Sequence, residues 1–103
     1  MIKKQYVKTR KVTKITFELP KNLEHDNVHL LADFNDWQPV AFERLKNGKW
    51  KLVQEVAGTG AYEFRYMSKQ GDNYLFFNDD SADTHVANPL GTTNSVVDCQ
   101  RIN

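Results

Sequence analysis

The sequence predicts an all-β fold of antiparallel strands, either a sandwich or a barrel. Short runs of β-branched and aromatic residues recur along the chain, whereas helical periodicity is hard to find. Asn47-Gly48 separates two such runs and is typical of a hairpin, since both residues tolerate the positive φ of a tight primed turn. Two further turns are expected at 57–60 and 69–72.

The expected strands follow one another at short intervals along the whole chain. In chain order they cover 5–9, 12–19, 28–34, 41–46, 49–56, 61–68, 73–78 and 94–101. In the second strand the apolar row is Val12, Ile15, Phe17 and Leu19, and the first step breaks the alternation, so a bulge is possible there. In 28–34, Val28, Leu30, Ala32 and Phe34 alternate with residues of the other face.

The expected strand 61–68 separates its two faces clearly. Tyr62, Phe64 and Tyr66 share one face, which we interpret as core. Arg65 then points outward. Trp50 alternates with Leu52 in the preceding strand, and we interpret it as structural.

The length of 103 residues predicts one domain, 1–103, in which 1–11 is a basic N-terminal arm or an edge strand. Residues 1–14 hold six basic side chains and no acid: Lys3, Lys4, Lys8, Arg10, Lys11 and Lys14. Lysines commonly protect exposed sheet edges, and this interpretation is favoured over contact with an anionic partner. Nucleic acid is not expected as a partner, because Tyr6 is the only aromatic residue among these charges.

Catalysis, metal binding and cofactor binding are not expected. The chain is too short for a (β/α)₈ barrel, which has about 250 residues, and it contains no nucleophile motif, P-loop or dinucleotide fingerprint. The histidines at 25, 29 and 85 lack metal-ligand spacing. Residues 78–83 are rich in Asn and Asp but do not match a calcium loop, so we expect a solvated loop.

Cys99 is the only cysteine, and we expect a buried, reduced thiol. The first residues, MIKKQYVKTRKV, contain no uninterrupted apolar run, so neither a signal peptide nor a membrane span is expected. These two observations predict a cytoplasmic location.

Trp37 follows the turn residues Asn35 and Asp36, so the strand alternation does not dictate its burial. It either folds over the end of the core or is exposed as a binding plane. An exposed indole suits a sugar, because the apolar C–H face of a pyranose stacks on a ring while its hydroxyls need directional hydrogen bonds. Trp37 would supply the plane, and Arg65 and Asn94 the hydrogen bonds.

Three segments carry a family resemblance in this order: LADFNDW at 31–37, GAYEFRYMSKQGDN at 60–73 and NPLGTTNSVV at 88–97, with GKW at 48–50 between the first two. Over roughly residues 12–100 the chain resembles the starch- and glycogen-binding modules of branching enzymes, isoamylases and pullulanases, and of the β subunit of AMP-activated protein kinase. The resemblance implies an immunoglobulin-like early-set β-sandwich of about seven to eight strands. It also implies non-catalytic binding of α-1,4-linked glucans such as glycogen or starch.

The resemblance assigns glucan-binding positions one by one. Trp37 matches the tryptophan that stacks on glucose, and Arg65 replaces a lysine, keeping the charge while altering the hydrogen-bond geometry. At the second stacking position, a tryptophan in the family, Phe76 is the best match and Tyr74 the second. A smaller ring covers less of a sugar, which implies lower affinity. The matching loop positions are Leu90, Thr92 and Asn94.

Two functions stay open. In the first, the aromatic platform and the polar loop bind an α-glucan oligosaccharide or polysaccharide. In the second, the domain is a protein-interaction or regulatory sandwich associated with a glycoside hydrolase or another glycan-metabolising enzyme, without sugar binding. The second predicts exposed apolar surface or an unpaired edge strand away from Trp37, with Tyr6 and Val7 as candidates.

Overall fold

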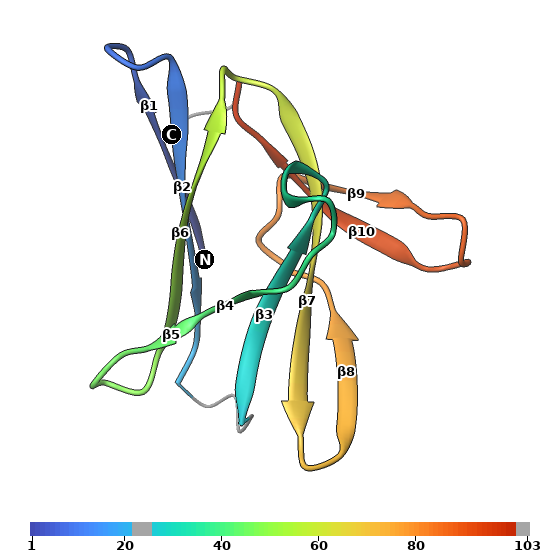
Figure 1. The fold of residues 1–103 in the computed structure, drawn as a ribbon. Coiled ribbons are helices and arrows are strands. Elements are labelled where there is room, and N and C mark those ends of the chain that lie inside the picture. The colour runs from blue at the N-terminus through green and yellow to red at the C-terminus, as the bar shows by residue number, and fades with distance from the viewer. Residues whose placement is uncertain (22–25, 101–103) are drawn as a thin grey trace.

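The computed structural model describes residues 1–21 and 26–100. They form two antiparallel sheets that pack face to face (Figure 1), so the predicted all-β, immunoglobulin-like sandwich is confirmed. The described residues contain no α-helix, only a 3-10 turn at Asp33–Asn35 (η1). His25 and the last residue of the expected strand 94–101 lie outside the described residues.

The smaller sheet has four strands in the order β1-β2-β6-β5. Their bounds are β1 Ile2–Val7, β2 Val12–Leu19, β6 Trp50–Ala57 and β5 Glu43–Arg44. Among the residues that the structure describes, β1 pairs only with β2, so the basic N-terminus forms an edge strand. It begins earlier than the expected 5–9 because Ile2, Lys4 and Tyr6 form its inner row.

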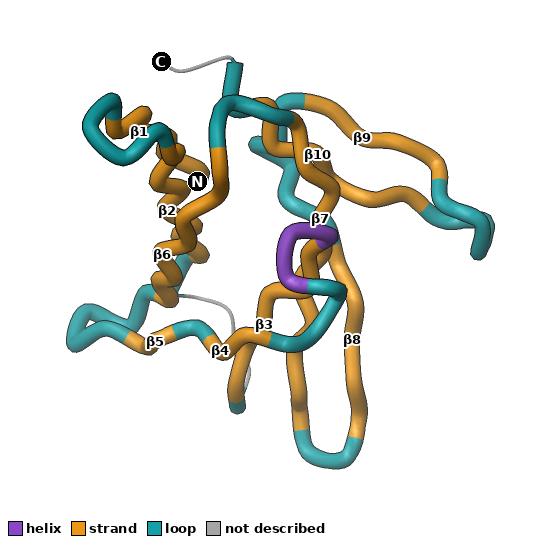
Figure 2. Tube along the Cα trace, turned by 45° about the horizontal axis from the view of Figure 1, so that its top comes forward, coloured by secondary structure: helices purple, strands orange, loops and turns teal. Residues whose placement is uncertain are grey.

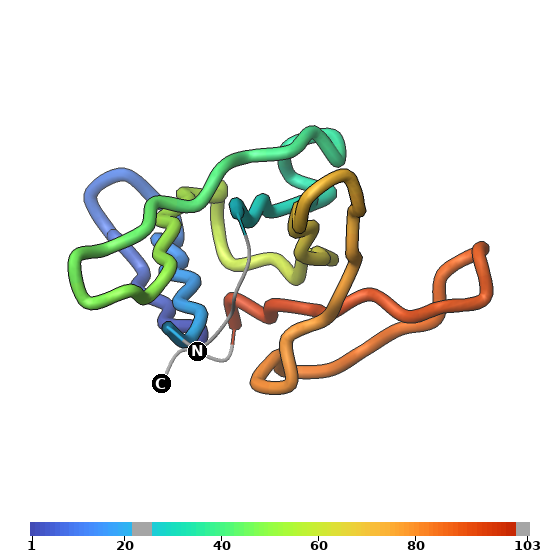
Figure 3. The backbone as a smooth tube through the Cα atoms, turned by 90° about the horizontal axis from the view of Figure 1, so that it is seen from below, coloured from blue at the N-terminus to red at the C-terminus, as the bar shows by residue number. Residues whose placement is uncertain are grey.

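The larger sheet has six strands in the order β4-β3-β7-β10-β9, with β8 paired to β7 beside this path. Their bounds are β4 Val40–Ala41, β3 Asn27–Ala32, β7 Ala61–Gln70, β10 Thr93–Asp98, β9 Thr84–Ala87 and β8 Asn73–Phe77. β10 pairs with the first part of β7 and β8 with its second part. Seen from below, the β9–β10 hairpin extends away from the smaller sheet (Figure 3).

The core lies between the sheets, where alternate residues of the central strands are buried. Phe17 of β2 meets Phe64 of β7 edge to face, with ring centroids 5.2 Å apart, and Tyr66 packs beside both. The interpretation of the Tyr62, Phe64 and Tyr66 row as core is therefore right, although Tyr62 is only partly buried. The predictions that Trp50 is structural and that Cys99 is a buried free thiol are confirmed.

The bulge considered in β2 is absent. The register with β6 is continuous from Val12 opposite Ala57 to Leu19 opposite Trp50. Thr13 occupies the inward position that an apolar residue was expected to fill, and its hydroxyl donates a hydrogen bond to the Gly58 carbonyl at 2.7 Å. The alternation of inward and outward residues in β2 is therefore regular. It could not be seen in the sequence because one inward residue, Thr13, is polar and has its hydrogen bond satisfied.

The expected strand 41–46 is two short strands in different sheets. β4 belongs to the larger sheet and β5 to the smaller, and the buried Phe42 lies between them. The Asn47-Gly48 turn also differs from expectation, because only Gly48 has positive φ, at 88°. Leu45 accepts a hydrogen bond from the Gly48 amide and donates one to the Lys49 carbonyl, so the loop is a three-residue turn with a left-handed glycine rather than a primed turn.

Two buried or partly buried polar contacts support the fold, and the first of them links the two layers. The Lys4 ammonium lies 2.9 Å from an Asp83 carboxylate oxygen and 2.9 Å from the Asp98 carbonyl, which links β1 to the other sheet. The Tyr66 hydroxyl donates a 2.5 Å hydrogen bond to Asp79. Asp79 also accepts from Ser81 and is buried, so the expectation of a solvated loop over 78–83 is wrong at this residue.

Candidate functional site

A groove of about 670 Å³ lies on the outer face of the larger sheet. Five of the seven predicted binding residues line it: Trp37, Arg65, Phe76, Leu90 and Asn94. The strand register explains the meeting of two of them, since Phe76 lies opposite Met67, two residues along β7 from Arg65 on the same face. Leu31 lies opposite Arg65 on β3 and also lines the groove.

The 3-10 turn places Trp37 at the edge of this groove (Figure 2, purple). β3 ends at Ala32 instead of Phe34, and the Asn35 side chain accepts a hydrogen bond from the Ala32 amide. The Trp37 amide then donates to the Ala32 carbonyl at 2.8 Å. Asp36 and Trp37 both have left-handed backbones, with φ of 57° and 59°, which non-glycine residues rarely adopt.

Neighbouring side chains fix the base of the same turn. Phe34 packs edge to face against Tyr62, with ring centroids 5.6 Å apart. The Asp33 carboxylate accepts a 3.0 Å hydrogen bond from the Glu63 amide of β7. The backbone that leads into Trp37 is therefore fixed, while the indole itself stays 40% exposed.

Arg65 lies against the second ring. Its guanidinium carbon is 5.6 Å from the centre of the Phe76 ring, within the range of a cation–π contact. Its hydrogen bond to the Thr92 hydroxyl is long, at 3.4 Å, and its Nε atom is buried without a partner within the described residues. A guanidinium has five N–H donors, so the terminal nitrogens of Arg65 keep hydrogen-bonding capacity beside an exposed ring.

Asn94 belongs to a polar network at the other side of the groove. Its amide nitrogen donates to Glu63 at 3.1 Å, and its oxygen accepts from the Asn88 amide at 3.0 Å. The Asn88 oxygen in turn accepts from the backbone amides of Leu90 and Thr92. Asn88 thus fixes the loop that holds Leu90, which is 85% exposed, above the groove.

The remaining two predicted residues do not line the groove. Thr92 is exposed, and its hydroxyl contacts two of the lining residues, Arg65 and Asn88. Tyr74 is on the same face of β8 as Phe76, two residues closer to the hairpin turn, and it is exposed outside the groove.

Sequence reasoning missed five lining residues: Leu31, Glu63, Ala87, Asn88 and Pro89. Leu31 and Glu63 occupy outward positions of the alternation in β3 and β7, and Glu63 is two residues before Arg65. That shared face was a usable signal. Asn88 was already inside a segment that carried the family resemblance, but only the positions that matched the family's contacts were selected.

The groove combines apolar rings with a guanidinium, a carboxylate and two amides. Such a lining provides a stacking surface and directional donors and acceptors. Within residues 1–21 and 26–100 there is no group of three or more His, Cys, Asp or Glu side chains placed to hold a metal ion. The geometry can hold a polar ligand that also has an apolar face.

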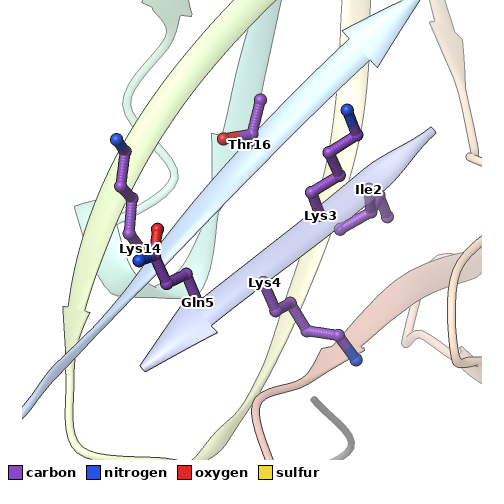
Figure 4. A pocket seen from close by; sticks show the side chains of 6 residues that line it. All are labelled: Ile2, Lys3, Lys4, Gln5, Lys14 and Thr16. Atoms are coloured by element: carbon purple, nitrogen blue, oxygen red, sulfur yellow. The ribbon is translucent and has the colours of Figure 1, made fainter. Parts of the chain in front are cut away.

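A second hollow, of about 370 Å³, lies beside β1 and β2 (Figure 4). Its polar lining includes Lys3, Gln5 and Lys14, and Lys4 points away from the other two lysines. Because the Lys4 ammonium is already paired with Asp83, it is not free to bind a ligand there. We therefore place the candidate site at the groove of the larger sheet.

No family model matches the chain, and no curated protein matches it. In the part of the chain that the structure describes, no helix has the length and apolar character needed to cross a membrane.

Proposed function

We propose that this protein is a non-catalytic module that binds α-1,4-linked glucans of the glycogen or starch type in the groove of the larger sheet. The observation that carries the proposal is the position of two exposed rings, Trp37 and Phe76, along one groove together with Arg65 and Asn94. Two stacking planes and flanking polar groups suit consecutive glucose units.

The polar groups support a ligand rich in hydroxyls. The Glu63 carboxylate offers acceptors and is held by a hydrogen bond from the buried Asn94, and the Arg65 guanidinium has donors beyond its bond to Thr92. The family resemblance of the segments around these residues points to the same ligand class. Because the groove is open and much of the ligand stays hydrated, the dissociation constant should lie roughly between 10 μM and 1 mM.

The test is a titration with β-cyclodextrin followed by amide NMR, together with co-sedimentation with glycogen. The amides of Trp37, Arg65 and Asn94 should shift. Trp37→Ala should weaken binding at least about tenfold, because the indole contributes a stacking surface and not core packing. Val53→Ala, an exposed apolar residue of the other sheet, is the matched control and should bind as the unchanged protein does.

The alternative is an interaction domain of a glycan-metabolising enzyme without sugar binding. Its candidate contacts, Tyr6 and Val7, are partly buried within β1. A titration in which no amide near Trp37 moves would reject glucan binding and leave this alternative. A cytoplasmic location is part of the proposal and is supported by the buried free thiol of Cys99.

A further inference from the structure

β8 is an edge strand with an apolar, uncharged surface. Its sequence is Asn-Tyr-Leu-Phe-Phe, and Tyr74, Leu75 and Phe76 are each about half exposed, at 56%, 47% and 52%. Among the described residues it pairs with β7 alone (Figure 1). A neutral, aromatic strand with one open edge is a template for pairing with another strand.

Three other edges of the molecule carry features that discourage such pairing. β1 turns a lysine, Lys4, inward into an ion pair. β5 has only two residues, Glu43 and Arg44, and both are charged. β4 also has two residues and follows directly after Pro39. β8 has five residues and carries neither a charge nor a proline. The remaining edge strand, β9, is also uncharged, but it has four residues and one large exposed apolar side chain, Val86, against three on β8.

The hydrogen-bond pattern shows which backbone groups face the open edge. The two-residue turn of the β7–β8 hairpin closes on the pair Gln70–Asn73, so the hydrogen-bonded pairs continue at every second position and include Ser68–Leu75. The N–H and C=O groups of Tyr74 and Phe76 therefore point away from β7. The same two residues turn their rings to the outer face.

We propose that β8 pairs with β8 of a second copy of this chain, antiparallel and about a two-fold axis through Leu75. In this register Tyr74 forms a hydrogen-bonded pair with Phe76 of the second copy, and the symmetric pair repeats it. The aromatic rings meet across the strands on the outer face. The two Leu75 side chains meet on the opposite face, and no charged residue of β8 opposes another.

The small area buried by this contact limits the affinity of the dimer. A strand of five residues covers far less than the roughly 800 Å² per partner of a standard interface, so the dimer is weak, with a dissociation constant of the order of 0.1–1 mM. The pairing joins the two larger sheets into one continuous face and brings the two grooves side by side. Provided the proposed function holds, one long glucan occupies both grooves and strengthens the dimer by effective concentration.

The test uses Leu75, because its side chain lies opposite the buried Ser68 and points away from the groove. Sedimentation equilibrium from about 10 μM to 1 mM should show dimer formation by the unchanged chain. Leu75→Lys and Leu75→Glu should each raise the dimer dissociation constant at least about tenfold, since two like charges then face each other across the axis. An equimolar mixture of the two variants should recover the dimer.

The controls separate this inference from sugar binding. Trp37→Ala should dimerise as the unchanged chain does, and Leu75→Lys should keep its affinity for β-cyclodextrin, a ligand too small to span two grooves. An unchanged chain that stays monomeric at 1 mM overturns the proposal, as does a Leu75→Lys variant that dimerises normally or a mixture that stays monomeric. A dimer that persists without glucan binding supports the strand pairing and rejects the proposed function alone.

Discussion

The outer face of the smaller sheet pairs opposite charges, whereas the outer face of the larger sheet exposes rings. On the smaller sheet Lys14 lies opposite Glu55, and Glu18 lies opposite Lys51. On the larger sheet the corresponding surface carries Trp37 and Phe76, which are 40% and 52% exposed. The two faces belong to strands of the same kind and share one core.

This difference separates what the fold requires from what it does not. Both sheets need an apolar inner row, but a solvated outer row of cross-strand charges satisfies the smaller one. Exposed rings gathered along one groove add nothing to the core, and such a patch is typical of a binding surface. The contrast supports the proposal that the ligand binds to the larger sheet, while the outer face of the smaller sheet is solvated.

The largest effect should come from Lys4, a charged residue of the smaller sheet that does not lie on the outer face. Lys4 lies on β1 but points inward, with its side chain 4% exposed, and it contacts Asp83 and the Asp98 carbonyl. Lys4→Met should lower the free energy of unfolding by about 3 kcal/mol, because it leaves the Asp83 carboxylate without its partner. Urea unfolding followed by circular dichroism measures the change.

Lys3→Met is the control, since Lys3 is the exposed neighbour on the same strand. It should change the unfolding free energy by less than about 0.5 kcal/mol. Equal effects of the two substitutions would show that the inward ion pair contributes nothing and that charge on this strand acts only through solubility.

Lys4 also shows what could not be predicted from the sequence. The alternation of β3 and β7 predicted the core and the outward position of Arg65, because period-two burial is a local signal. An inward lysine resembles a solvated one in the sequence, and its acceptors are 79 and 94 residues away in the chain. Only the packing of the two sheets shows that Asp83 and Asp98 are there to receive it.

The residues of the groove also include some that could be predicted from the sequence and some that could not. Trp37, Arg65, Phe76, Leu90 and Asn94 could be selected from the sequence, and they share one groove. The role of Asn88 could not, because its importance depends on hydrogen bonds that form only once the loop has folded. The 84–87 strand was missed because none of its four residues is buried, so it carries no apolar alternation.

The next effect depends on pH and comes from Asp79, the buried carboxylate that accepts a hydrogen bond from Tyr66. Burial acts to raise the pKa of Asp79, but hydrogen bonds from Ser81 and Tyr66 outweigh it and hold that pKa below its usual value. A carboxyl with a lowered folded pKa stabilises the fold above its unfolded pKa, about 3.9, and this stabilisation is lost as the pH falls through the folded value. Asp79→Asn should therefore cost about 2 kcal/mol at pH 7.

The difference in unfolding free energy between the unchanged chain and Asp79→Asn should shrink from pH 7 to pH 2.5, as measured by urea unfolding. Asp80→Asn is the matched control because Asp80 is exposed next to it, and it should leave the pH profile unchanged. A constant difference at all pH values would mean that the lost stability comes from packing and not from the charge of Asp79.

A smaller effect should sharpen the assignment of the second ring. Phe76→Trp widens the stacking plane without changing its position on β8, so affinity for β-cyclodextrin should rise about three- to tenfold, or about 0.7–1.4 kcal/mol. Tyr74→Trp should not change it, because Tyr74 lies outside the groove. Titration at a protein concentration too low for dimers measures both. The reverse result would assign the stacking role to Tyr74.

The smallest effect belongs to the charged face. Arg10 binds Glu55 through two contacts, at 2.8 and 3.0 Å, and the hydrogen bond from Arg10 lowers the Glu55 pKa. Both side chains are exposed, and water and salt screen such pairs. Glu55→Gln should therefore leave the urea midpoint and the affinity for β-cyclodextrin unchanged. A loss of affinity in this variant would couple the two outer faces through the core, and the division of the molecule into a solvated face and a binding face would not hold.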